Sequence, residues 1–203
     1  MERFDNRKTA AKKTAVFGLA LVLAALLLLA AYAGLGRPAS GEASPAIIPD
    51  GETVSPPETP DDDTLRLTVP AMARVKDLPV GTGPADDEAI LAESALHVEG
   101  TGFPWEEGTN VYIAGHRLGY EGEASHLVFY DLDVLKSGDE VILTDADGTR
   151  YAYRVFRSFV VGPSDYHVTE PVPGKSVVSL QTCTLPDYSE RLVVQAELTG
   201  VSS

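Results

Sequence analysis

The chain is 203 residues long and carries 16 Lys and Arg against 30 Asp and Glu, a formal net charge of −14 at pH 7. A surface this acidic repels phosphate backbones, which argues against nucleic-acid binding, so no nucleic-acid partner is expected. The single cysteine has no partner for a disulfide within its own chain, which leaves its thiol for chemistry or for packing.

The first segment with a clear prediction is the uncharged stretch 14–36, in which most residues are Leu, Ala or Val. At about 1.5 Å per residue, a helix over this stretch is about 34 Å long, enough to cross a hydrocarbon core of about 30 Å. Residues 1–13 carry a net charge of +3, which predicts a cytoplasmic N-terminus and an extracytoplasmic remainder. The alternative is a signal peptide cleaved near residues 30–33, but the apolar stretch is longer than the usual core of about 7–15 residues. We predict an uncleaved single-pass anchor in the cell membrane.

Residues 37–63 form the predicted linker. They contain one basic and seven acidic residues and are rich in Pro and Ser. Such a composition favours an extended, self-repelling spacer without a core. The remaining residues, 64–203, carry a charge of −11 and have the length of one extracytoplasmic domain.

The pattern of residues 64–203 is mainly strand-like. Alternating or continuous apolar runs predict strands at 65–69, 111–114, 141–143, 150–161, 177–180 and 191–198. Short helices are predicted at 86–93 and 132–135. Asp145 to Gly148 predicts a hairpin turn rather than a calcium loop, because the ligands are too few, and the alternation slips at Phe156 and Arg157, which indicates a bulge. Many short strands joined by turns indicate an all-β barrel or sandwich.

Three residues far apart in the sequence carry candidate chemistry. A thiol has an ordinary pKa of about 8.5, so a nucleophilic cysteine needs a neighbouring imidazole or cation to favour its thiolate. Cys183 ends one predicted strand, Arg191 begins the next, and His116 ends a strand-like run far upstream. If the two later strands pair, the loop 184–190 brings thiol and guanidinium to the same end of the sheet. For each residue a structural alternative stays open: a buried small hydrophobe, a surface cation and a turn histidine.

The motifs around these residues resemble those of sortases, the membrane-anchored cysteine transpeptidases of Gram-positive-type bacteria. Segment 179–183, Ser-Leu-Gln-Thr-Cys, matches the family's Thr-Leu-x-Thr-Cys with Ser for the first Thr, and Arg191 follows it. Segment 110–117 ends in Ala-Gly-His-Arg, as the family's histidine segment often does, and segment 129–140 is similar to the stretch between the two motifs. The resemblance covers about residues 65–198.

The resemblance implies a fold and a set of site residues. The implied fold is all-β, a sortase-type eight-stranded β-barrel with one or two short helices, preceded by a single transmembrane helix. Cys183 is the implied nucleophile, His116 the general acid/base, and Arg191 the group that stabilises the oxyanion or the substrate. The implied substrate-binding residues are Thr182, Leu180 and Ser179. No cofactor and no metal are implied.

The resemblance also implies an activity. The substrate is a C-terminal sorting signal of the Leu-Pro-x-Thr-Gly kind, cleaved between Thr and Gly through a thioacyl intermediate. The expected partners are that peptide, an amine of a peptidoglycan precursor or a pilin, and the membrane. The chain lacks an Asp-Pro-Trp lid motif before the domain, which weighs against a pilus-polymerising sortase. Segment 161–177 is too short for the extra helix of the haem-uptake class, which weighs against that class. Ala-Gly-His-Arg and the short Cys-to-Arg spacing lean towards classes D, E or F, of which class E accepts Ala at the second signal position.

Other functions fit less well. L,D-transpeptidases carry a Ser-His-Gly-Cys arrangement around the nucleophile, and no such arrangement surrounds Cys183. Papain-like peptidases place Cys before His in the chain, whereas here His116 precedes Cys183. A membrane-tethered, non-catalytic β-domain that binds a cell-wall component keeps the topology. That alternative leaves Cys183, His116 and Arg191 without a shared purpose.

Overall fold

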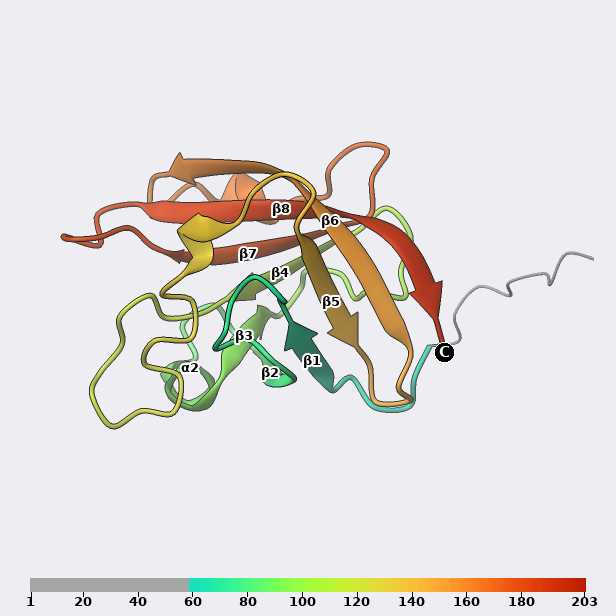
Figure 1. Ribbon diagram of the computed structural model, residues 1–203, viewed down its shortest axis with the longest axis horizontal. Coiled ribbons are helices and arrows are strands. Elements are labelled where there is room, and N and C mark those ends of the chain that lie inside the picture. Colours follow the sequence, from blue (N-terminus) through green and yellow to red (C-terminus); the bar gives the residue numbers. More distant parts are fainter. Residues whose placement is uncertain (1–58) are drawn as a thin grey trace, which may run out of the picture. The chain divides into compact units, whose positions relative to one another are not determined.

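The computed structural model describes residues 59–203, and these fold as a closed eight-stranded β-barrel with short helices (Figure 1). This confirms the barrel that the resemblance implied. The predicted anchor at 14–36, the segment before it and most of the linker lie outside the described residues. Within residues 59–203, no helix combines the length and the apolar character that crossing a membrane requires.

The elements follow one another along the chain as mostly short strands. They are β1 (Leu65–Thr68), β2 (Leu78–Gly83), α2 (Glu88–Glu93), β3 (Ala95–Val98), β4 (Asn110–Ala114), the 3₁₀ turn η1 (Leu132–Val134), β5 (Glu140–Thr144), β6 (Arg150–Val161), the 3₁₀ turn η2 (Tyr166–Thr169), β7 (Val177–Cys183) and β8 (Arg191–Ser202). Around the barrel the order is β1-β2-β3-β4-β7-β8-β6-β5, and β5 pairs with β1 to close it. The pairs β2–β3 and β4–β7 are parallel, and the other pairs are antiparallel.

Six of the eight strands were predicted from the apolar pattern, and β2 and β3 were not. β2 contains Pro79 and two glycines, which are depleted in strands, and β3 has only four residues. A Cβ at Gly81 or Gly83 would lie 2.9 Å from the side chain of Ile90 in α2. The glycines that hide the strand pattern therefore let the helix pack closely against the sheet.

The predicted hairpin turn before β6 and the predicted bulge within β6 are both confirmed. Asp145 Oδ1 accepts the backbone N–H groups of Asp147 (3.0 Å) and Thr149 (2.8 Å), so the aspartates serve the turn between β5 and β6. The register of β6 with β8 shifts between Val155 and Arg157, where the alternation slips in the sequence. A bulge re-aims the side chains that follow it, and here Phe159 and Val161 line a hollow on the outer face.

The barrel interior is apolar and lies behind the strands that carry the candidate site. Side chains alternate between the two faces of a strand, so every second residue of β4, β7 and β8 enters the core. These inward residues are Val111, Ile113, Val178, Leu180, Leu192, Val194 and Ala196. The residues between them form the outer face.

Candidate active site

The outer face of β7, β8 and β6 is arranged in rows by the strand register. The row at one end, which we call the thiol row, consists of Cys183, Arg191 and Val161. Two residues further along each strand lie Gln181, Val193 and Phe159, and after two more lie Ser179, Gln195 and Arg157. We call this third set the Arg157 row. β4 and β6 flank β7 and β8 in the barrel (Figure 1).

The candidate nucleophile and the candidate cation are direct cross-strand neighbours. Cys183 is the last residue of β7, is partly exposed and is paired with Arg191, the first residue of β8. Residues opposite one another in an antiparallel pair have Cβ atoms about 4.5–5.5 Å apart. The structure therefore places Arg191 where its charge acts on the surroundings of the thiol.

The strand pairing also carries His116 towards Cys183. Ala114 at the end of β4 is paired with Gln181, and the Gly115 N–H donates to the Gln181 carbonyl (3.0 Å) beyond that end. Thr182 Oγ1 donates to the Gly115 carbonyl (2.8 Å), which extends the link by another residue. Continued past the end of β4, this register carries His116 towards Cys183 on the neighbouring strand.

The imidazole of His116 lies in a close-packed pocket. Its side chain is 22 % exposed, and its buried Nε2 has no hydrogen-bond partner within residues 59–203. The Glu123 carboxylate is 4.0 Å from Nε2 and accepts the backbone N–H of Tyr120 (3.1 Å). A Cβ at Gly119 would lie 2.9 Å from the imidazole, and one at Gly115 would lie 2.8 Å from the ring of Phe129. Both glycines are therefore needed for this packing, and sequence reasoning did not identify Glu123.

The Arg191 guanidinium is fixed by its own loop and acts on the groove. It donates from Nη1 to the carbonyls of Tyr188 (3.0 Å) and Glu190 (3.1 Å). Burial raises the pKa of Tyr112 well above its usual value, and the charge of Arg191 offsets part of that rise. Arg191 and Tyr112 also line the same hollow on the outer face.

The three residues expected to bind substrate lie beneath the surface. Thr182 is 1 % exposed and holds the Gly115 carbonyl, so it joins β7 to the segment that carries His116. Leu180 is 1 % exposed and belongs to the barrel core. Ser179 is fully buried and hydrogen-bonded to Asn110 and Gln195. Leu180 therefore supports the outer face from the core, Thr182 links β7 to the segment that carries His116, and Ser179 is a buried member of the outer face.

A hollow of about 440 Å³, which we call the first hollow, extends from Arg191 over the outer face. Its floor includes Tyr112 and Gln181, whose side chains share a hydrogen bond of 2.8 Å from the phenol to the amide oxygen. The segment 162–169, which includes η2, forms its other wall. Sequence reasoning missed Tyr112 and Gln181, although their spacing from Cys183 and Ala114 in steps of two was the signal that they share the outer face.

Comparisons with known proteins show which family this barrel belongs to. Residues 67–199 match the family model described as Sortase domain. Sortase A of Streptococcus agalactiae serotype III (strain NEM316) is 37% identical over 92 residues, which is 45% of this chain and 37% of that protein. Sortase A of Bacillus anthracis is 34% identical over 95 residues, 46% of this chain and 42% of that protein. The aligned part thus spans about two fifths of the length of these curated relatives.

Solved structures with the same barrel cover more of the chain. A lid mutant of sortase A from Corynebacterium diphtheriae superposes with a TM-score of 0.60 at 28% identity, covering 70% of this chain and 72% of that one. Sortase C-3 from Streptococcus pneumoniae superposes with a TM-score of 0.60 at 31% identity, covering 71% and 67%. The similarity therefore extends over most of the described barrel.

Proposed function

The chain belongs to the sortase family, and on that premise we propose that it is a cysteine transpeptidase that cleaves a Leu-Pro-x-Thr-Gly-like sorting signal and transfers the protein to an amine. The observation that carries the proposal is the thiol row: Cys183 is paired with Arg191 at the end of the first hollow. The register of β4 with β7, continued past Ala114, supports a position of His116 close to Cys183. In this proposal a peptide that lies in the first hollow beside Arg191 extends over Cys183 to His116, which lines a separate hollow.

In the first half of the reaction Cys183 becomes acylated. Its thiolate attacks the carbonyl carbon of the signal's Thr, a C–S bond forms, and the negative charge moves to the carbonyl oxygen. Arg191 stabilises that oxygen by charge and hydrogen bonding. The bond between Thr and Gly then breaks, and protonated His116 gives its proton to the departing nitrogen. The products are a thioester on Cys183 and a free amine that carries the remainder of the signal.

In the second half an amine resolves the thioester. The incoming nitrogen attacks the same carbonyl carbon, and neutral His116 accepts the proton that this nitrogen loses. The C–S bond breaks, Cys183 leaves as thiolate, and a new amide bond joins the protein to the acceptor. The acceptor is an amine of a peptidoglycan precursor or a pilin, which places the product on the cell wall.

The buried motif residues act as supports in this proposal. Thr182 keeps the backbone of Gly115 against β7, and through it the position of His116 relative to Cys183. Ser179 and Leu180 fix β7 from the outer and inner side respectively. Their role is to hold the thiol row in place.

The predicted topology fits a substrate that is exported. We propose that residues 14–36 anchor the chain in the cell membrane with residues 1–13 in the cytoplasm. The acidic linker 37–63 then holds the catalytic domain, 64–203, outside the cell, where sorting signals and wall amines meet.

The class within the family is a finer proposal. Ala-Gly-His-Arg at 114–117 and the short spacing between Cys183 and Arg191 favour class D, E or F. The relatives described above are named sortase A and sortase C. Competition between otherwise identical peptides with Pro or Ala at the second signal position tests this: preference for Ala indicates class E, and a strict requirement for Pro excludes it.

The activity is tested with the full 203-residue chain in detergent, a peptide that contains the signal, and a panel of amines. Mass spectrometry of the products should show the peptide up to Thr joined to the amine, together with the released C-terminal fragment. The variant Cys183→Ala should form neither product. Product formation that persists in that variant would refute the mechanism.

The alternative, a non-catalytic wall-binding domain, predicts a different result. No transfer product should then form with any peptide or amine, and the chain should still bind isolated cell wall. The proposed function further predicts that transfer is lost in His116→Gln. His126→Gln is the matched control for that variant, because it makes the same change at a histidine outside the proposed machinery.

A further inference from the structure

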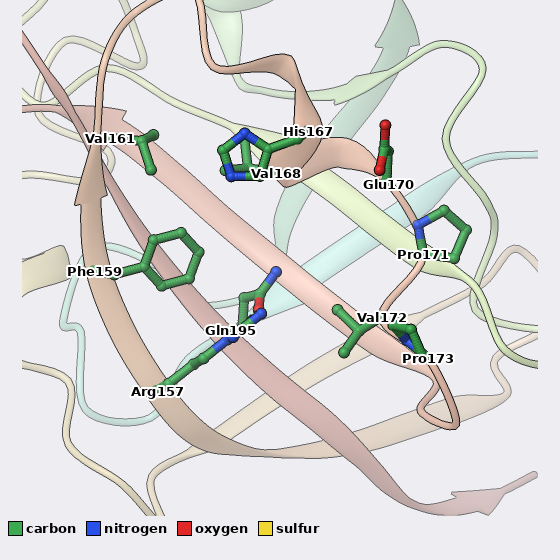
Figure 2. A pocket seen from close by; sticks show the side chains of 10 residues that line it. All are labelled: Arg157, Phe159, Val161, His167, Val168, Glu170, Pro171, Val172, Pro173 and Gln195. Carbon is green, nitrogen blue, oxygen red and sulfur yellow. Dashed lines mark hydrogen bonds between the residues drawn. The ribbon is translucent and has the colours of Figure 1, made fainter.

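A second hollow of about 440 Å³ adjoins the first on the same outer face (Figure 2). The two hollows share Val161 and Val168 in their linings, so they are adjacent. Phe159 supplies an aromatic surface on the β6 side, and residues 171–173 form the facing apolar wall. Arg157 lies at one end, with its side chain directed towards Gln195 in Figure 2.

The Arg157 guanidinium is held in place by a chain of buried amides and hydroxyls. Its Nε donates to Gln195 Oε1 (2.6 Å), and Gln195 Nε2 donates to Ser179 Oγ (2.9 Å). Ser179 Oγ donates in turn to Asn110 Oδ1 (2.7 Å). The three neutral members are at most 1 % exposed, so each is fixed by the need to satisfy its buried polar atoms.

The other end of this series of hydrogen bonds, at Asn110, fixes the wall of the hollow. Asn110 Nδ2 donates to the backbone carbonyls of Val168 (2.9 Å) and Glu170 (3.0 Å). Both belong to segment 162–173, which lines the two hollows and which we call the covering segment. One hydrogen-bonded network therefore positions both the covering segment and the guanidinium. Such a network is what a preorganised binding subsite requires.

The charge of Arg157 is not neutralised by the protein. Within residues 59–203 no carboxylate lies within ion-pair distance of it, although the domain is strongly acidic and five other Arg and Lys side chains are paired. Its guanidinium carbon lies 5.0 and 5.4 Å from the ring centroids of Phe159 and Phe156. Glu170 also lines the hollow but lies on the opposite side from Arg157 (Figure 2). A planar cation stacked on aromatic rings keeps its outer N–H groups for a carboxylate.

The direction of a bound peptide follows from the proposed chemistry. The departing nitrogen must face His116, so the part of the signal after Thr lies towards the hollow that His116 lines. The part before Thr then extends the other way, past Arg191 and over the first hollow, whose lining includes Tyr112 and Ala114 of β4 as well as Arg191, towards the second hollow over β8 and β6.

The distance identifies which residue of the substrate arrives at Arg157. Arg157 lies four residues along the strands and two strands across from Cys183, about 13 Å by about 10 Å, which is roughly 16 Å in all. An extended peptide covers this distance in about five residues. Counted back from the reacting Thr, and with the reach of the Arg157 side chain, this is one of the two residues directly before the Leu of the signal.

We propose that the second hollow is a subsite for the residues immediately upstream of the sorting signal, and that Arg157 selects an acidic side chain there. This inference rests on the proposed transpeptidase function. Arg157 contacts the substrate, and Gln195, Ser179 and Asn110 are positioning residues that hold it and the covering segment.

The test uses the full chain and three signal peptides that differ only in the two residues before Leu, which are both Glu, both Gln or both Lys. KM and kcat are measured for the release of the C-terminal fragment. The Glu peptide should have a KM about fivefold lower than the Gln peptide, as for a partly exposed ion pair, and the Lys peptide the highest KM, with kcat alike for all three. Arg157→Glu should reverse the order. Arg154→Glu, which makes the same charge reversal on β6 but lies outside the hollow, should keep it.

The outcomes separate this inference from the function on which it rests. Equal KM values for the three peptides would overturn the subsite and leave the transpeptidase proposal standing. A preference for Glu that persists in Arg157→Glu would overturn the assignment to this hollow. Failure of the chain to process any of the three peptides would overturn the proposed function and this inference with it. Arg157→Lys should keep a reduced preference for Glu, because it retains the charge but loses the bond to Gln195.

Discussion

The inner and outer faces of β4, β7 and β8 use the same three strands for opposite purposes. Inward residues such as Ile113, Leu180 and Val194 are aliphatic and fully packed. Outward residues such as Tyr112, Ser179 and Gln195 are polar, and their hydrogen bonds run across the strands rather than along them. The inner face fixes the barrel by burial, and the outer face fixes the direction of individual side chains by hydrogen bonds.

This difference has a consequence for mutation. A change on the inner face should cost stability and affect every function of the domain alike. A change on the outer face should alter one step of the reaction or one specificity while the barrel remains folded. The predictions below test that division.

The largest expected effect is on the outer face at His116. His116→Gln removes the proton donor and acceptor, so the rate of signal cleavage should fall by about 10²–10⁴-fold. The urea midpoint of unfolding should change little, because the Nε2 atom of His116 makes no hydrogen bond within residues 59–203. Steady-state kinetics and urea unfolding of the same preparations check this, with His126→Gln as control. Equal loss of activity in both variants would contradict the role of His116.

The next effect concerns the inner face. Leu180→Ala leaves a cavity in the barrel core and should lower the free energy of unfolding by about 2–5 kcal/mol. Leu185→Ala makes the same change in the loop after β7, where the side chain is 37 % exposed, and should cost much less. Denaturant unfolding followed by tryptophan fluorescence measures both. A similar cost at the two positions would show that the core does not lie where the barrel places it.

A smaller effect is expected for the buried polar chain. Ser179→Ala leaves Asn110 Oδ1 without its donor and Gln195 Nε2 without its acceptor, and should cost about 1–3 kcal/mol of unfolding free energy. Ser158→Ala is the matched control, since Ser158 is exposed and makes no side-chain hydrogen bond within residues 59–203. Ser179→Ala should also weaken the preference for an acidic upstream residue, which a purely structural serine would leave unchanged.

The smallest effect is a pH dependence at His97, a buried polar side chain on β3. Burial lowers the pKa of His97 below its usual value near 6.5. Below that pH the unfolded chain takes up the proton first, so the free energy of unfolding falls as pH decreases, by at most about 1.4 kcal/mol per pH unit. The contribution is fully present above about pH 6.5. His97→Gln should remove this part of the slope in urea titrations at several pH values, and an unchanged slope would assign it to other groups.

The strands that could be predicted are those whose own residues alternate or form apolar runs. β6 and β8 are long enough for this pattern to be clear, and the bulge near Arg157 appeared as a break in it. β2 could not be predicted, since Gly81 and Gly83 are dictated by the approach of Ile90 from another element. The reason for these glycines lies in α2, which packs against β2, and cannot be found in the sequence of β2 alone.

The site shows the same limit. Cys183, His116 and Arg191 could be proposed as site residues because Cys183 and His116 lie within short motifs and Arg191 follows the first of them. The burial of Ser179 and Leu180 and the role of Gln195 could not, since they depend on the register of strands that are distant in sequence. The chain from Arg157 to Asn110 joins four strands, and no local pattern records it.

The central claim is that Cys183 forms a thioester with the Thr of a sorting signal, and the most direct measurement is the mass of that adduct. The full chain is mixed with a signal peptide, quenched in acid before an amine is added, digested and mapped. The account predicts an increase equal to the peptide up to Thr, located on the fragment that contains Cys183 and removed by hydroxylamine. An unmodified Cys183 in a sample that is actively releasing the C-terminal fragment would contradict it.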